Sequence, residues 1–120
     1  EEKQAATLAM PSGTMLRLDD ENGKKMIQLQ DKDGGNSLVM DLEAGEITLK
    51  AASKITLDVG GNQIVIDSGG NITIKGSATI KTEGTDIQSK ATNGLKMESA
   101  QMDLSASVQA SLKGGMVKIN

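Results

Sequence analysis

The chain has 120 residues and contains no Phe, Tyr or Trp. A globular core normally depends on aromatic side chains for bulk, so their absence argues against an ordinary globular domain. Cys and His are also absent. Disulfides and thiolate metal sites are therefore excluded, together with the commonest metal ligand and the commonest general base at neutral pH.

Other classes of protein are disfavoured by charge and hydropathy. The formal net charge is −3, and a nucleic-acid partner would call for positive charge and aromatic stacking platforms. No run of about 18 apolar residues occurs, so we expect no membrane-spanning helix. The only proline, Pro11, lies in a stretch without periodicity, and we interpret residues 1–13 as a linker or the remnant of an upstream segment.

The feature that is present is an apolar pair that returns about every eight residues. The two members of a pair lie two residues apart and so point to the same face of a strand. The residues between and just after them are mostly polar, which predicts a repeat array of short strands with one dry and one wet face. The pairs are Ile47/Leu49, Ile55/Leu57, Ile64/Ile66, Ile72/Ile74, Ile80/Thr82, Ile87/Ser89, Leu95/Met97, Met102/Leu104, Ala110/Leu112 and Val117/Ile119.

The length of this octad repeat indicates how a core is closed. Eight residues span at most about 27 Å when extended, whereas coils of single-chain solenoids take roughly 20 residues or more. If three chains each supply one side, a coil of about 24 residues closes around an apolar axis. We therefore predict an all-β fold in which residues 45–120 form an intertwined, trimeric (three-stranded) β-helix. A single chain would have no core of its own.

A short β-strand neck is expected over residues 14–44, where the apolar pairs are more widely spaced. Its turns are predicted at Glu21-Asn22-Gly23-Lys24 and Asp33-Gly34-Gly35-Asn36. Its boundary with the predicted β-helix is expected near Ala44-Gly45. Glycine and other small residues are expected at the corners of the β-helix. The neck pairs are Leu16/Leu18, Ile27/Leu29 and Leu38/Met40; the corners are Gly60-Gly61, Gly69-Gly70, Gly76, Gly84, Gly94, Ser99-Ala100, Ser105-Ala106-Ser107 and Gly114-Gly115.

No catalytic constellation is recognisable, and we expect neither an enzyme nor a cofactor or metal site. The one carboxylate cluster, Asp19-Asp20-Glu21, is interpreted as a solvated hairpin end rather than an acid/base pair or cation site. The segments Gly34-Gly35-Asn36, Gly60-Gly61-Asn62 and Gly69-Gly70-Asn71 lack the fuller pattern of calcium-binding nonapeptides and are interpreted as corners.

Two further candidate sites depend on the predicted trimer. Thr82 and Ser89 are the only polar residues at inward positions, and two such axial polar rings would hold water or a small ion, or would bond to nearby backbone. At the C-terminal end, an open apolar layer is a candidate docking platform for a tip partner. The alternative is that the natural chain continues beyond it. The platform residues are Gly115, Met116, Val117, Ile119 and Asn120.

Several segments resemble a known family. They are Arg17-Leu18-Asp19-Asp20, Ile27-Gln28-Leu29-Gln30, Ser37-Leu38-Val39-Met40-Asp41, Glu46-Ile47-Thr48-Leu49-Lys50, Gly70-Asn71-Ile72-Thr73-Ile74-Lys75-Gly76 and Gly114-Gly115-Met116-Val117-Lys118-Ile119-Asn120. Over residues 14–120 the chain is similar to the C-terminal part of VgrG proteins of type VI secretion and to spike proteins of contractile phage tails. Full-length relatives carry upstream barrel domains that dock on the baseplate and tube.

The resemblance implies a structural, membrane-puncturing needle at the front of a contractile injection system. Its implied partners are two further copies of the chain, upstream baseplate and tube proteins, a PAAR-repeat cone at the tip and, transiently, the target membrane. Such a needle is assembled in the cytoplasm of the producing cell and then injected or released with the particle. The alternative is the trimeric β-helical stalk of a phage tail fibre or surface adhesin. A polysaccharide-cleaving β-helix is disfavoured by the lack of aromatic residues.

Overall fold

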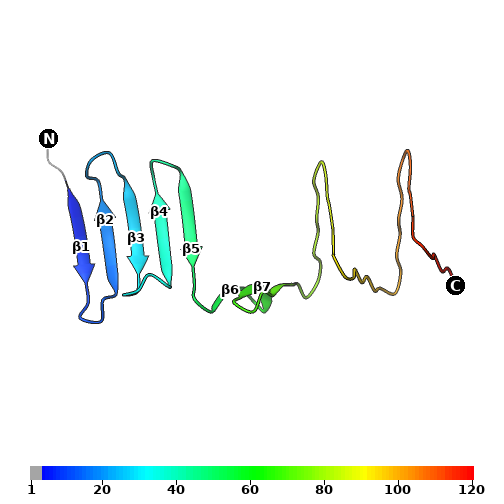
Figure 1. Cartoon of the computed structure of the whole chain (residues 1–120), viewed down its shortest axis with the longest axis horizontal. Coiled ribbons are helices and arrows are strands. Elements are labelled where there is room, and N and C mark those ends of the chain that lie inside the picture. Colours follow the sequence, from blue (N-terminus) through cyan, green and yellow to red (C-terminus); the bar gives the residue numbers. More distant parts are fainter. Residues whose placement is uncertain (1–3) are drawn as a thin grey trace. The chain divides into compact units, whose positions relative to one another are not determined.

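The computed structural model describes residues 4–120, and within this range the chain forms β-strands, turns and bends but no helix. The prediction of an all-β fold is therefore confirmed. The chain divides into two units, one up to Thr82 and one from Glu83. All the strands lie in the first unit, where they form two separate antiparallel sheets (Figure 1).

The first sheet is a five-stranded meander in which each strand pairs with the next one along the chain (Figure 1). Its connections are short turns, as antiparallel neighbours permit. The strands are β1 (Ala5–Ala9), β2 (Met15–Asp19), β3 (Met26–Gln30), β4 (Ser37–Asp41) and β5 (Glu46–Lys50).

The register of this sheet aligns the apolar pairs of successive strands into two columns. Both columns lie on one face because alternate residues of a strand point the same way. The opposite face carries a mostly polar column. The apolar columns are Leu8, Leu16, Leu29, Leu38, Leu49 and Ala6, Leu18, Ile27, Met40, Ile47; the opposite one is Thr7, Arg17, Gln28, Val39, Thr48.

The sheet differs from the sequence-based expectation at both of its edges. Residues 1–13 were interpreted as a linker or the remnant of an upstream segment; β1 lies within this range, and its Ala6 and Leu8 lie opposite Leu18 and Leu16 and extend both columns. The small Ala side chains make this periodicity hard to detect. At the other edge the sheet continues past the expected boundary near Ala44-Gly45, since β5 pairs with β4.

The second sheet consists of β6 (Lys54–Val59), β7 (Asn62–Asp67) and β8 (Ile72–Lys75). Its register again produces two apolar columns, and these are Ile55, Ile66, Ile72 and Leu57, Ile64, Ile74. We expected the neighbours of these strands to come from other chains, but the structure pairs them within one chain. The expected corners at Gly60-Gly61 and Gly69-Gly70 are thus hairpin turns.

The reversal at Gly60-Gly61 explains this difference. Both residues have positive φ, 56° and 87°, which is the conformation of a two-residue type I′ turn and matches the twist of the flanking strands. Asn22 and Gly23 also have positive φ, 54° and 77°, and the Lys24 amide donates to the Glu21 carbonyl at 2.9 Å. The turn predicted at residues 21–24 is therefore confirmed.

From Gly76 onwards no strand is formed within the chain, and extended segments are separated by single bends. The bends begin at Ser77, Thr85, Thr92, Ala100, Ser107 and Gly115, so they recur every seven or eight residues. Every apolar pair from Ile80/Thr82 to Val117/Ile119 lies between two bends or after the last one. The bends thus recur at about the same interval as the apolar pairs, although the described chain closes no coil by itself.

A small residue precedes every one of these bends: Gly76, Gly84, Ala91, Ser99, Ala106 and Gly114. Two of these positions have little space for a side chain, since a Cβ at Gly114 would lie 3.1 Å from the Met116 carbonyl oxygen and one at Gly76 would lie 3.0 Å from Ile80 Cγ1. Gly94, expected as a corner, instead follows the bend at Thr92-Asn93.

Candidate functional site

The apolar columns of the two sheets have no cover in the single chain. Among residues 4–120 no side chain is buried, and large apolar residues of both sheets are exposed, for example Ile47 at 72% and Ile72 at 71%. An antiparallel sheet normally packs its apolar face against a core. This surface, which we call the apolar face, is therefore the principal candidate for an interaction site.

The size of the uncovered surface can be estimated. The accessible surface is 11106 Å² for a chain of 12.5 kDa, whereas a compact monomer of that mass exposes about 6,200 Å². The excess of about 4,900 Å² is in the range of obligate interfaces between subunits. This excess is summed over both sheets and the residues from Gly76 onwards, so it is an upper limit for the area that the apolar face alone contributes.

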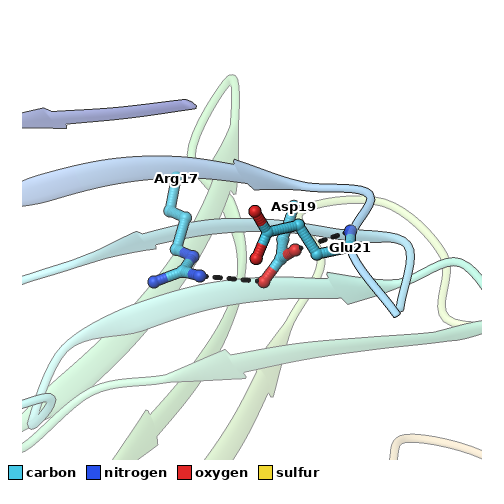
Figure 2. A network of polar contacts seen from close by, with 3 residues as sticks. All are labelled: Arg17, Asp19 and Glu21. Carbon is cyan, nitrogen blue, oxygen red and sulfur yellow. Dashed lines mark hydrogen bonds and ion pairs between the residues drawn. The ribbon is translucent and has the colours of Figure 1, made fainter. Parts of the chain in front are cut away.

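The carboxylate cluster of the first sheet serves the turn between β2 and β3. Asp19 accepts a hydrogen bond from the Glu21 backbone amide at 2.9 Å and pairs with the Arg17 guanidinium at 3.0 Å (Figure 2). The Glu21 amide, and then Arg17, hold the pKa of Asp19 below its ordinary value. A stably ionised carboxylate that holds a turn is a poor general acid, in agreement with the interpretation as a hairpin end.

An aspartate performs the same task at the ends of further strands. Asp58 accepts from the Gly61 amide at 3.1 Å, Asp67 from Gly69 at 2.9 Å, and Asp41 from Ala44 at 3.0 Å. These are Asx-type turns, in which the side chain replaces a backbone acceptor. Sequence reasoning missed this series, although a signal exists: Asp19, Asp41, Asp58 and Asp67 each directly follow an apolar pair.

The Gly-Gly-Asn segments lie in hairpin turns rather than at the expected solenoid corners, and the side chains of their asparagines are engaged in hydrogen bonds. The Asn36 side-chain oxygen accepts from the Ala52 amide at 3.1 Å, and that of Asn62 accepts from the Ser77 amide at 2.8 Å. Asn71 donates to the Asp67 carboxylate at 3.2 Å. Because all three side-chain amides already have protein partners, these segments resemble structural clips more than cation ligands.

The remaining predicted site residues lie on the extended segments. Thr82 and Ser89 occupy the same place in their repeats, three residues before a bend, which is also the place of Met97, Leu104 and Leu112. At the C-terminal end, Gly115 and Met116 form the last bend. Val117 and Ile119 follow it, and the exposed fraction of Ile119 is 85%.

Searches of the described residues for other kinds of site were negative. No group of three or more acidic, His or Cys side chains among residues 4–120 is placed to hold a metal ion. The same residues include no helix long and apolar enough to cross a membrane. The sequence matches no known family model, and a search of curated proteins finds no relative of it.

Proposed function

We propose that three copies of the chain assemble through the apolar face into a needle, with residues 76–119 of each copy wound into a three-stranded β-helix. The needle acts as the membrane-puncturing spike of a contractile injection system, of the kind found in type VI secretion or a phage baseplate. Its activity is mechanical, and no catalytic step is assigned to it.

One observation carries this proposal: every apolar column in both sheets is continuous, and none of its side chains is buried within the single chain. Burial of a Leu or Ile side chain contributes roughly 1.5–3 kcal/mol, and no described part of the same chain provides that burial. Copies related by a threefold axis would place identical columns opposite one another. Narrow interiors of this kind favour aliphatic over aromatic side chains, which agrees with the composition.

The backbone of residues 76–119 supports the same assembly. These segments have no strand partner within the chain, and unpaired strand edges readily pair with other chains. A bend every seven or eight residues turns the chain at regular intervals, as three faces of a prism require. Each chain would then advance by one face per repeat and find its strand partners in the other two copies.

A PAAR-repeat cone is proposed as the partner of the tip. Three copies of Val117 and Ile119, both exposed in the single chain, would form an apolar layer, and an exposed apolar layer is a typical interaction surface. Met116 would add an adaptable apolar contact at the rim. The particle would be assembled in the cytoplasm of the producing cell and leave it on injection or release.

Variants of the tip test this function. We expect Val117→Asp or Ile119→Lys to abolish binding of the PAAR-repeat cone while the trimer persists, because the other repeats are unchanged. Lys118→Asp, between them on the opposite side of the strand, is the matched control and should still bind. If isothermal calorimetry shows that all three variants bind the cone as tightly as the unaltered chain does, the tip is not the docking platform. A trimer that binds no cone but attaches to a cell surface would favour the stalk of a fibre or adhesin.

A further inference from the structure

Repeated apolar pairs create a problem of register for the proposed trimer. Most pairs consist of Ile, Leu, Met or Val, so sliding one chain by a whole repeat would exchange many of these side chains for similar ones; the exceptions are Thr82, Ser89 and Ala110. Register is weakly specified wherever alternative pairings bury equivalent faces. Beyond the polar Thr82 and Ser89, another feature of the chain is needed to distinguish one apolar repeat from the next.

Charged residues between the bends provide such a feature. The residues two places before successive bends are Glu83, Lys90 and Glu98, whose charges alternate in sign. In an extended segment these residues lie on the side opposite to the apolar pair. Four places before the bends, Lys96 is followed one repeat later by Asp103. This outer side is accessible, since the side chains of Lys96 and Glu98 are 80% and 75% exposed and form an ion pair at 2.9 Å.

The geometry of the proposed trimer brings these residues together between chains. If each chain advances by one face per repeat, the strand beside a given repeat belongs to the neighbouring copy and is one repeat further along. Adjacent strands lie about 4.8 Å apart. Glu83 of one copy then faces Lys90 of the next, Lys90 faces Glu98, and Lys96 faces Asp103.

We propose that these alternating charges fix the register of the three chains. A slip of one repeat in one direction would place each charged residue beside the same residue of the neighbouring chain. A slip in the other direction would place Glu83 beside Glu98. Both slips bring like charges together, which is unfavourable for directly opposite residues. This inference rests on the proposed trimer and adds a specificity that the apolar face does not supply.

Engineered disulfides can report the register. Gln101 and Gln109 both lie six residues before a bend and are uncharged. In the double variant Gln101→Cys/Gln109→Cys, the thiol at 101 of one copy lies beside the thiol at 109 of the next, so oxidation should yield a covalent trimer on a denaturing gel. Gln109→Cys alone should give no cross-link, whereas a slipped register would give covalent dimers.

Charge reversal then tests the cause. In the double-cysteine protein, Lys90→Glu should lower the thermal midpoint of the trimer by about 5 °C or more and reduce the covalent trimer. The compensated variant Glu83→Lys/Lys90→Glu/Glu98→Lys should restore both the thermal midpoint and the yield of covalent trimer. Lys113→Glu makes the same change in net charge, but its predicted neighbours are Ser105 and Asn120, so it should have little effect.

The outcomes separate this inference from the proposed function. If sedimentation shows that the unaltered chain is not a trimer, the proposed function fails. If the chain is a trimer but Lys90→Glu and Lys113→Glu behave alike, the charges do not set the register. A restored midpoint in the compensated variant, together with a smaller effect of Lys90→Glu in 1 M salt, would support the role of charge.

Discussion

Replacement of Leu38 by Ala tests whether other copies of the chain cover the apolar face. Leu38 lies on β4, the central one of the last three strands of the first sheet, between Leu29 and Leu49. Within one chain it is only partly covered, so truncation there should cost about 1 kcal/mol, roughly half of the transfer value. In a packed core the same change costs about 2–5 kcal/mol per side chain.

Three symmetry-related copies multiply this effect to about 6–15 kcal/mol per trimer, and each 1.4 kcal/mol is about a tenfold change in an equilibrium constant. The expected result for Leu38→Ala is therefore a loss of at least about 10⁴-fold in the trimerisation constant, measured by concentration-dependent denaturation. Val39→Ala is the matched control, because its neighbours on the opposite face are Gln28 and Thr48. Equal effects of the two variants would refute the assignment of faces.

Three further predictions follow from the turns and the axis. The pKa values of the turn-holding Asp19, Asp58 and Asp67 lie below their ordinary value of 3.8. The pKa of Asp31 is lowered in the same way, because its carboxylate accepts hydrogen bonds from the side chain and the backbone amide of Asn36 in the turn between β3 and β4. Since a lowered pKa stabilises the fold only while the group is ionised, stability measured by denaturation should be constant above about pH 5 and decline as the pH falls through 3.8 and below. Gly61→Ala should destabilise each copy by about 1–2 kcal/mol, because alanine disfavours the positive φ of this position. A Cβ there would contact nothing, so no steric clash adds to this effect. An unchanged melting temperature would contradict the type I′ turn. Thr82→Val with Ser89→Ala should raise the melting temperature if the hydroxyls are merely tolerated on the axis, whereas a marked fall would indicate a bound water or ion.

The strands of the neck and the octad repeat could be predicted from the sequence because their physical cause is local. Alternation such as Ile27-Gln28-Leu29-Gln30 specifies a strand with one apolar face, and Asn22-Gly23 specifies a tight turn. Strand pairing could not be predicted in the same way. An apolar pair such as Ile64/Ile66 is compatible with a partner from its own chain or from another, and the turn at Gly60-Gly61 decides between them.

The candidate site was predictable to a similar degree. The apolar pairs identify the residues that form the face, but alternation alone does not reveal that Ala6 and Leu8 of β1 extend it. The turn-holding aspartates were missed because Asp at a strand end is common on any solvated surface. Only the hydrogen bonds from amides such as that of Gly61 distinguish these residues from ordinary surface charges.

Sedimentation equilibrium of the chain at micromolar concentration tests the central claim most directly. The account predicts a single species with three times the chain mass of 12.5 kDa, stable on dilution because the apolar face of each copy is covered by the other two. A species with the mass of a single chain at the same concentration, whose circular dichroism shows folded β-strands, would contradict it.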